Sequence, residues 1–378
     1  MKPDIPQVRQ TPDPQLDNIL QHWGFFTKTE IVEATAKGQL LMLDLDFGDK
    51  CSLHCAGCFR RKHVAENGLA NSDPNMTYDE IIDVISQAQA LGLRTVKLCG
   101  KGEPFENTEL LRFAHELTAR GIGLAIFTKG HVIGDDVLVA ETFGHEGITD
   151  GEMLCRELVK LKVSIMPSVP SFNDQLLGKL VGRRPEWYAP RLKLAVERLA
   201  KAGFNKTRPT RLALVHAPLT RVSIDGAFAV YHFARERNII PVLAAHMVSG
   251  KQITDEFLLK ADASDEKKHR LFQQVLAYNI KQGYQTHEQI LLDGPSCMPG
   301  IHPCNQIAVG LYVMIKGTVM RCPGDFAKSL GNIRDEPLAD IWERNRWWKW
   351  TGVHNVGCPY KDGHTLPLGL YDELKQEV

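Results

Sequence analysis

Short apolar runs alternate with longer segments of helical period along the first two thirds of the chain. Six of these runs have the length of strands: Leu40–Phe47, Thr95–Cys99, Gly123–Phe127, Lys162–Pro167, Thr210–His216 and Ile239–Ala245. The segments between successive runs are long enough to serve as crossover connections. This alternation predicts an α/β fold with parallel strands.

The first crossover helix is marked at both ends. Thr77 is a favourable N-cap residue with Glu80 three positions later, and Gly92 is expected to end the helix. An apolar stripe between them identifies the buried face: Ile81, Ile82, Ile85, Ala88 and Leu91. The later stretch Gly130–Arg156 exceeds a simple connection, and we expect an insertion with some helix there.

The pattern changes in the last third of the chain. Residues 252–290 are charged and helical, and after Leu291 glycine, proline and cysteine become frequent. One β-hairpin is predicted, Ile307–Met314 against Thr318–Cys322. We therefore expect four parts, which are a leader over 1–37, the α/β domain over 38–250, a helical linker over 251–290 and a small domain over 291–378.

Composition narrows the possible classes of function. Lys+Arg and Asp+Glu are both 45, so the net charge of zero gives no general attraction to nucleic acid or an anionic membrane. No stretch approaches the roughly 20 apolar residues that span a bilayer, and no signal peptide is visible. We expect a cytoplasmic protein. In a reducing compartment, nine cysteines gathered mainly at two places indicate metal ligation more than disulfides.

The first cysteine cluster follows the first predicted strand directly, as Cys51-Ser-Leu-His-Cys55-Ala-Gly-Cys58. Barrel-like α/β folds carry their active-site loops at this position. Three thiolates can bind three irons of a [4Fe-4S] cube and leave the fourth iron open to a small ligand. A zinc site that includes His54 or His63 is an alternative, but no fourth ligand follows at zinc-finger spacing. A second alternative is a buried loop with reactive thiols.

The spacing of these cysteines resembles the motif of the radical S-adenosylmethionine (SAM) superfamily. The resemblance implies a partial (β/α)6 TIM-type barrel. It also implies that the amino and carboxylate groups of SAM chelate the open iron. An electron from the cluster then cleaves SAM to a 5′-deoxyadenosyl radical, which abstracts hydrogen from a substrate.

Further segments match the family in the expected order. Gly100-Lys101-Gly102-Glu103-Pro104 resembles the Gly-Gly-Glu-Pro segment that holds the SAM amino group, because glycines admit a close ligand and a carboxylate suits an ammonium. Thr128-Lys129-Gly130 stands where the family usually has Thr-Asn-Gly near the ribose. Gly57 replaces the usual aromatic residue near the adenine. The resemblance implies two groups of cofactor-binding residues. For the SAM amino group they are Gly100, Gly102, Glu103 and Pro104, and for the ribose they are Thr128, Ser168 and Ser171. Arg221 is expected to reach the SAM carboxylate, and Phe59 the adenine. Ser168 and Ser171 are alternatively turn residues, and Arg221 a solvated loop residue.

The second cysteine cluster resembles a SPASM/Twitch extension, which binds auxiliary [4Fe-4S] clusters. Cys304, Gly317 and Cys322 match its opening, and a helix starting at Pro337 with Leu338, Ile341 and Trp342 on one face matches the family's next element. The resemblance implies one auxiliary cluster, bound by Cys297, Cys304, Cys322 and Cys358. Four thiolates leave no open iron, which favours electron transfer, whereas a cluster without Cys297 would hold substrate on its free iron.

These observations favour a radical SAM oxidoreductase that removes hydrogen from a small polar molecule and passes the remaining electron to the auxiliary cluster. An epimerase would instead return hydrogen from a thiol, and Cys99 and Cys155 are the two cysteines left for that role, although each is equally a small core residue. A third alternative is a maturase of a ribosomal peptide or protein. An iron-sulfur carrier would not need the SAM-binding segments. The expected partner is a reductant such as flavodoxin or ferredoxin, with no nucleic acid and no membrane.

Overall fold

The computed structural model describes residues 1–8, 10–13, 24, 26–58, 74–246, 260–293, 306–325, 329–346, 361 and 363–377. Its strands are β1 Met42–Leu45, β2 Thr95–Leu98, β3 Gly123–Thr128, β4 Ser164–Pro167, β5 Ala213–His216, β6 Ile240–Leu243, β7 Gly310–Val313, β8 Thr318–Met320 and β9 Gly331–Asn332. The helices of the first half are α2 Lys28–Ala36, α4 Tyr78–Ala90, α5 Leu110–Ala119, α6 Asp136–Phe143, α7 Gly151–Lys160, α8 Asp174–Val181 and α9 Pro185–Ala202. Those of the second half are α10 Ala227–Arg235, α12 Asp265–Gln282, α13 His287–Asp293, α14 Gln306–Val309, α15 Leu338–Asn345 and α16 Leu370–Glu377. Short 3-10 turns are η2 Pro104–Glu106, η3 Gly144–Glu146 and η4 Ile224–Gly226.

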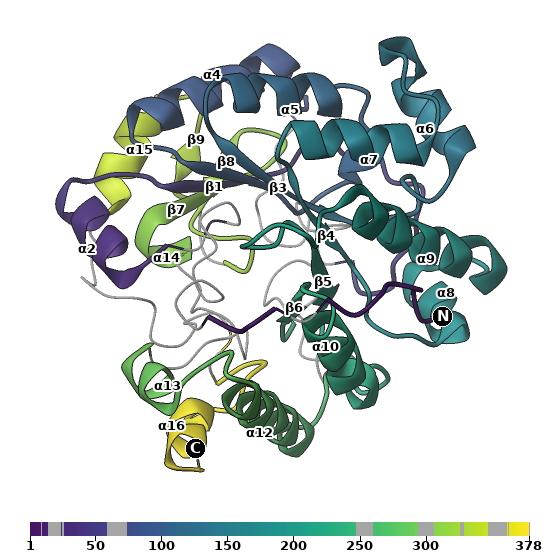
Figure 1. The fold of residues 1–378 in the computed structure, drawn as a ribbon. Coiled ribbons are helices and arrows are strands. Elements are labelled where there is room, and N and C mark those ends of the chain that lie inside the picture. Colours follow the sequence, from purple (N-terminus) through teal and green to yellow (C-terminus); the bar gives the residue numbers. More distant parts are fainter. Residues whose placement is uncertain are drawn as a thin grey trace.

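The first six strands follow one another in sequence order around a curved sheet with helices on its outer face (Figure 1). β1 to β4 pair in parallel, two parallel bridges lead from β4 to β5, and β5 pairs in parallel with β6. Within the described residues the far edge of β6 pairs with no strand, so the barrel is open there. The predicted α/β fold, a partial (β/α)6 TIM-type barrel, is confirmed. Five of the six apolar runs contain one of its strands, and β3 extends one residue beyond the third run, to Thr128.

Local sequence accounts for the crossover segments. The Thr77 side chain accepts from the Glu80 amide and the Glu80 carboxylate accepts from the Thr77 amide, so α4 begins with the expected capping box. Gly92 follows the helix with φ of +103°, a conformation that suits glycine. The long stretch from 130 to 156 contains α6, η3 and most of α7, in agreement with the predicted insertion.

The C-terminal hairpin adds to the barrel sheet at the edge of β1. β7 pairs in parallel with β1, and β8 returns antiparallel to β7 around Gly317, whose φ is +84°. The first predicted hairpin strand is shorter than expected, because Gln306–Val309 form a helical turn before β7 begins at Gly310. The sheet therefore runs without interruption from β4 through β1 to β9. The four-part division of the chain stays a prediction.

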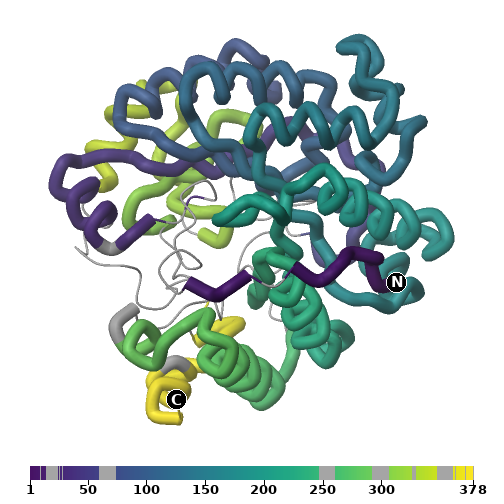
Figure 2. The backbone as a smooth tube through the Cα atoms, in the orientation of Figure 1, coloured from purple at the N-terminus to yellow at the C-terminus, as the bar shows by residue number. Residues whose placement is uncertain are grey.

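The last described residues pack beside β6, at the opposite edge of the open barrel. Lys361 Nζ donates to the Ala245 carbonyl at 3.0 Å, and Thr365 Oγ1 donates to the His246 carbonyl at 3.0 Å. α16 lies along α12, which packs on α10 (Figure 2). Segments that follow β6 in the sequence thus contact both edges of the open barrel, β1 through β7 and the end of β6 through Lys361 and Thr365.

Side chains alternate between the two faces of the strands. On β1 and β2, Leu43, Leu45, Val96 and Leu98 join the core beneath the outer helices, whereas Asp44 and Lys97 alternate with them and face the lumen. On β3 to β6 most lumen-facing residues are apolar, namely Ala125, Met166, Ala213, Val215, Ile240 and Val242, and the buried Ser164 shares the face of Met166 on β4. The lumen therefore has a polar wall on β1 and β2 and an apolar wall opposite.

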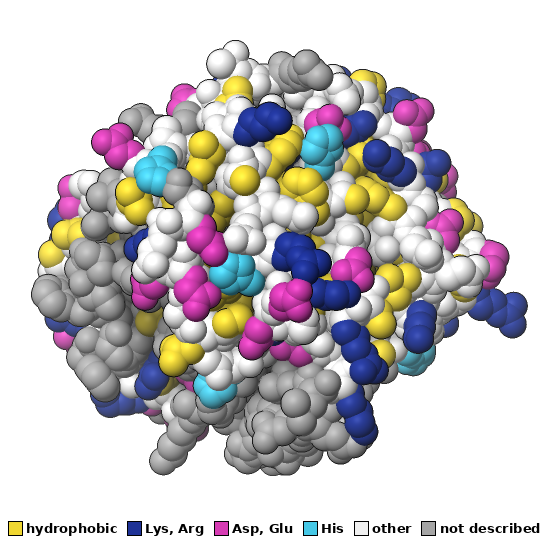
Figure 3. Space-filling model, turned by 90° about the horizontal axis from the view of Figure 1, so that it is seen from below, with side chains coloured by type: hydrophobic (Ala, Val, Ile, Leu, Met, Phe, Trp, Pro, Cys, Tyr) yellow, Lys and Arg dark blue, Asp and Glu magenta, His cyan; other side chains and the backbone are white. Residues whose placement is uncertain are grey.

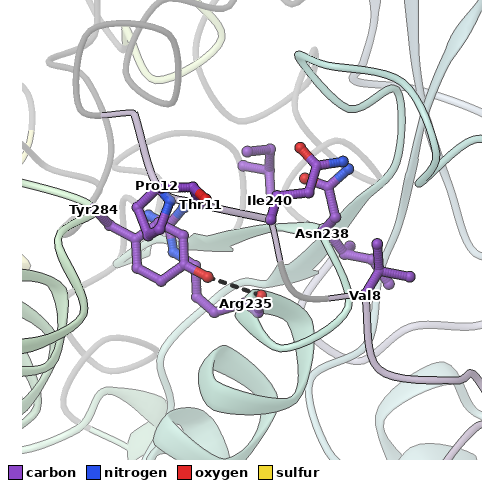
Figure 4. Close-up of a pocket in the computed structure, with 9 residues that line it drawn as sticks. Val8, Thr11, Pro12, Arg235, Asn238, Ile240 and Tyr284 are labelled. Atoms are coloured by element: carbon purple, nitrogen blue, oxygen red, sulfur yellow. Dashed lines mark hydrogen bonds between the residues drawn. The ribbon is translucent and has the colours of Figure 1, made fainter.

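A small cavity of about 20 Å³ lies where β6 begins, beneath the N-terminal segment. Val8, Thr11, Pro12 and Arg235 contribute to its lining, and Tyr284 Oη donates to the Arg235 carbonyl at 3.0 Å (Figure 4). This volume suits about one water molecule. The cavity is at the amino end of the strand, away from the loops that carry the first cysteine cluster.

Surface charge is mixed on the side where α12 and α16 lie, with acidic and basic side chains interspersed (Figure 3). None of the helices formed by the described residues is both long and apolar enough to cross a bilayer.

Candidate functional site

Four loops meet at the carboxyl edge of the barrel. They follow β1, β2, β3 and β4, and they carry the first cysteine cluster, the Gly100–Pro104 segment, Thr128–Gly130 and Ser168–Ser171 respectively. Parallel strands bring their carboxyl ends to one edge, and enzymes of this architecture place their sites there. The fold thus gathers segments that are about 120 positions apart.

The cysteine loop is held from below by a buried network. Both oxygens of Glu106 accept from the Ser52 amide, at 2.8 and 3.0 Å. His131 Nε2 lies 3.0 Å from Glu106 Oε1 and 3.2 Å from Ser52 Oγ. Arg183 donates to the Ser52 carbonyl. Residues after β2, after β3 and between α8 and α9 therefore fix the backbone beside Cys51, and no pattern in the sequence had indicated them.

The charge of Glu106 is maintained in this network. Burial acts to raise the pKa of Glu106, but the hydrogen bonds of His131 and Ser52 outweigh it and hold that pKa below its usual value. The carboxylate is therefore ionised at neutral pH and can accept both bonds.

Glu103 joins the loop after β2 to the end of β3. Its side chain is buried, Oε1 accepts from Thr128 Oγ1 at 2.6 Å, and Oε2 accepts from the Lys129 amide at 2.8 Å. Its own amide donates to the Lys50 carbonyl at 2.9 Å. Oε1 also accepts a longer bond of 3.4 Å from the Phe105 amide. A carboxylate has about four acceptor positions, so these three bonds leave one position for a cationic group.

The glycines beside Glu103 are required by packing against the loop after β1. Gly100 and Gly102 have φ of +115° and +85°. A Cβ on Gly100 would lie 2.0 Å from Asp46 Oδ1, and one on Gly102 would lie 2.7 Å from the Gly48 carbonyl oxygen. Larger residues would push this segment away from β1.

Asp46 connects the same segment to the C-terminal hairpin. Its side chain is 1% exposed. Oδ1 accepts from the Lys101 amide at 2.8 Å and from Tyr312 Oη at 2.6 Å, and Oδ2 accepts from the Ile315 amide at 3.1 Å. One buried carboxylate thus couples the Gly100–Pro104 segment to β7 and the turn after it.

The other expected cofactor residues have different surroundings. Ser168 Oγ accepts from Lys129 Nζ at 2.9 Å, whereas Ser171 Oγ accepts from the Asn173 amide at 3.0 Å, just before α8. Arg221 is exposed, and its amide donates to the Ala261 carbonyl. Pro104 is buried at the start of η2, and Phe59 lies outside the described residues.

Comparisons with known proteins identify two domains in this chain. The model of the radical SAM superfamily matches residues 45–216, and the model of the SPASM iron-sulfur cluster-binding domain matches residues 304–358. A radical SAM domain thus occupies residues 45–216, and a SPASM domain occupies residues 304–358.

Similar proteins agree with this assignment over parts of the chain. GTP 3′,8-cyclase of Clostridium perfringens is 31% identical over 98 residues, which are 25% of this chain and 29% of that protein. The chain thus matches less than a third of the length of this curated relative. Streptococcus suis SuiB bound to its precursor peptide SuiA has a TM-score of 0.56, with 16% identity over 92% of this chain and 79% of SuiB. The structure of anSMEcpe with bound AdoMet has a TM-score of 0.57, with 15% identity over 89% of this chain and 95% of that one. At these identities the two structures show a shared fold.

A radical SAM enzyme binds a [4Fe-4S] cluster and SAM, and a SPASM domain binds auxiliary iron-sulfur clusters. The first donor set suits such a cluster, because Cys51, Cys55 and Cys58 lie on one loop and form no disulfide, with the Cys58 amide donating to the Cys55 carbonyl. Desolvation by the surrounding loops, together with the charges of Glu103 and Glu106, raises the pKa of Cys51 to about 12, and metal ligation is what deprotonates such a thiol.

A single-ion site receives no support. In the part of the chain that the structure describes, no three His, Cys, Asp or Glu side chains are close enough to hold one metal ion. Three thiolates on separate corners of a cube stand farther apart than ligands of one ion.

Of the expected auxiliary ligands, Cys322 is buried directly after β8. Cys297, Cys304 and Cys358 lie outside the described residues, so the four-cysteine auxiliary set stays a prediction.

The two remaining cysteines have contrasting positions. The Cys99 thiol follows β2 and hydrogen-bonds the Asp44 carboxylate in the lumen. Cys155 is on α7 with its side chain fully buried in the core outside the barrel, and burial raises its pKa to about 12. The structure brings Cys99, but not Cys155, close to the site.

Proposed function

We propose that this radical SAM enzyme oxidises a small polar substrate and uses its auxiliary cluster as the electron acceptor. The supporting observation is the polar wall of the barrel lumen. Lys97 Nζ lies 3.1 Å from Asp44 Oδ1, both side chains are largely buried, and the pair stands between the Gly100–Pro104 segment and the hairpin that leads to Cys322.

Buried polar groups of this kind orient ligands. Binding sites are mostly apolar with a few placed polar groups, and the lumen offers this combination. Burial raises the pKa of Asp44, while Lys97 and the Cys99 thiol counteract that effect. A polar group of a substrate can replace part of this internal pairing, with its carbon chain against the apolar wall of β3 to β6.

The division of roles follows from the loops. Bound to the first cluster, SAM supplies the group that removes a hydrogen atom from the substrate. Glu103 is proposed to hold the SAM ammonium, Lys97 and Asp44 to orient the substrate, and the hairpin on β1 to hold the electron acceptor next to the lumen. The substrate loses one hydrogen atom, one proton and one electron.

Reconstituted enzyme incubated anaerobically with SAM, dithionite and size-separated metabolite fractions tests this proposal. We expect a small-molecule fraction to raise 5′-deoxyadenosine formation above its substrate-free rate and to give a product that lacks two hydrogens. The Cys322→Ala variant should still cleave SAM but lose that product, because the electron acceptor is damaged. Iron content and circular dichroism of the variant control for misfolding. Turnover confined to the peptide fraction would contradict the substrate class and favour a maturase.

An epimerase is a second candidate because the Cys99 thiol is in the lumen, hydrogen-bonded to Asp44. In this reaction the thiol returns a hydrogen atom, and the resulting thiyl radical takes one electron from the external reductant and one proton from water. The substrate mass is unchanged in ordinary water. Incorporation of one solvent deuterium into the product, lost in Cys99→Ala and kept in Cys155→Ala, would favour epimerisation over oxidation.

A further inference from the structure

A basic surface adjoins the cysteine loop at the junction of α8 and α9. The His54 amide donates to the Val181 carbonyl at 2.9 Å, and the Ala56 amide donates to the Leu180 carbonyl at 3.3 Å. Gly182 is so close that an added Cβ would lie 2.6 Å from the His54 carbonyl oxygen. The end of α8 (Figure 1) is thus hydrogen-bonded to the loop that carries the first three cysteines.

This junction has an excess of positive charge although the chain as a whole has none. Between positions 174 and 193 there are five basic side chains and two acidic ones, a net charge of +3, against zero for the chain. Arg191 and Lys193 are paired with Asp135 and Glu197 outside this range, so the unpaired charge lies at the end of α8. Lys179 and Arg184 are exposed, and neither forms an ion pair with a described residue. Both charges are therefore available to a partner.

An aromatic side chain stands within the basic surface. The guanidinium groups of Arg183 and Arg191 lie 5.4 and 4.5 Å from the ring centroid of the half-exposed Trp187. Stacking on an indole ring holds arginines in place. Tryptophan and arginine are also the residues enriched at the centres of protein interfaces.

We propose that Lys179, Arg183, Arg184, Trp187 and Arg191 form the docking surface for an acidic one-electron carrier protein of the flavodoxin or ferredoxin class. The proposal rests on the assignment of Cys51, Cys55 and Cys58 as ligands of the first cluster. One electron passes from the reduced carrier to the oxidised cluster, so the carrier is oxidised by one electron and no atoms are exchanged. Opposite charge on the two surfaces accelerates and orients the encounter.

The test compares two reductants in SAM cleavage without substrate. Flavodoxin, kept reduced by its reductase and NADPH, must dock, whereas dithionite need not. In Lys179→Glu/Arg184→Glu we expect the flavodoxin-driven rate to fall about tenfold or more at low salt, within the range of electrostatic steering. The dithionite-driven rate should change by less than about twofold, since neither side chain contacts the cysteine loop through a hydrogen bond.

Lys281→Glu is the matched control. Lys281 is exposed in the last turn of α12, which like α8 ends at a glycine of positive φ, and α12 packs on α10 and α16. Both rates should match wild type in this variant. A neutral Lys179→Ser/Arg184→Ser variant should give an intermediate loss and a weaker salt dependence of flavodoxin binding, measured by titration of the reconstituted enzyme.

Flavodoxin binding and flavodoxin-driven cleavage at wild-type levels in both double variants would overturn the docking proposal. Dithionite-driven cleavage reports separately on the first cluster. A failure of wild type to cleave SAM with dithionite would therefore refute the cluster assignment itself, and the two failures are distinguishable.

Discussion

The buried carboxylate of Asp46 joins the proposed SAM-binding segment to the C-terminal hairpin, and its hydrogen bonds set the size of the effect expected on mutation. A hydrogen bond to a charged group contributes about 1.5–3 kcal/mol. Tyr312→Phe removes the 2.6 Å bond and keeps the ring, so we expect a loss of about 2 kcal/mol in unfolding free energy. Asp46→Asn removes the negative charge that accepts from Lys101, Tyr312 and Ile315, and places an amide NH₂ among these donors. We expect a loss of about 3 kcal/mol in unfolding free energy.

Denaturant unfolding of the two single variants and the double variant forms a double-mutant cycle. The side chains are in contact, so the two losses should be less than additive by about 1–2 kcal/mol. Asp46→Asn should also weaken SAM binding to the reconstituted enzyme, because the Lys101 amide loses its charged acceptor. Tyr284→Phe is the control, since its hydroxyl bonds the Arg235 carbonyl at the amino end of β6 and its loss should leave SAM affinity unchanged. Additive losses, or unchanged SAM affinity in Asp46→Asn, would refute the coupling.

Three further predictions concern the loops and the core. Glu103→Ala should raise the SAM dissociation constant about tenfold or more without loss of iron, and equal affinity would show that the carboxylate does not bind the ammonium. Glu106→Gln weakens the hydrogen bond that the Ser52 amide donates to the carboxylate. The rate of cluster incorporation, measured as iron per chain, should therefore fall, and a wild-type rate would contradict this role. His216 is fully buried, neither ring nitrogen has a hydrogen-bond partner among the described residues, and burial lowers its pKa from 6.5 to about 3. Between pH 6.5 and pH 3 only the unfolded state binds the proton, so this histidine destabilises the fold as the pH falls. From pH 7 to pH 5 the unfolding free energy of wild type should fall by about 2 kcal/mol more than that of His216→Leu. Equal losses in the two proteins would refute this linkage.

Periodicity predicted the strands of the barrel because each is short, apolar and locally marked. It placed the cysteine loop and the Gly100–Pro104 segment after β1 and β2, and strand order then brought them to one edge. The hairpin turn at Gly317 was also visible, because a glycine between two apolar runs is a local signal.

The contacts that connect these parts have no local signal. Tyr312 and Asp46 are 266 positions apart, and neither neighbourhood indicates the other. Glu106 and His131 read as ordinary loop residues until the fold places both next to Ser52. The pairing of β7 with β1 was missed for a similar reason, since an apolar run does not specify which free sheet edge it joins.

The three cysteines after β1 are decisive for the function. The measurement is 5′-deoxyadenosine formed from SAM and dithionite by anaerobically reconstituted wild type and by Cys51→Ala/Cys55→Ala/Cys58→Ala. Wild type should hold about eight irons and form 5′-deoxyadenosine, whereas the triple variant should keep about half of the iron and form none. The reason is that, with the four auxiliary cysteines predicted above, the first cluster alone has an open iron. Formation of 5′-deoxyadenosine by the triple variant at the wild-type rate would contradict the assignment of these cysteines to the SAM-cleaving cluster.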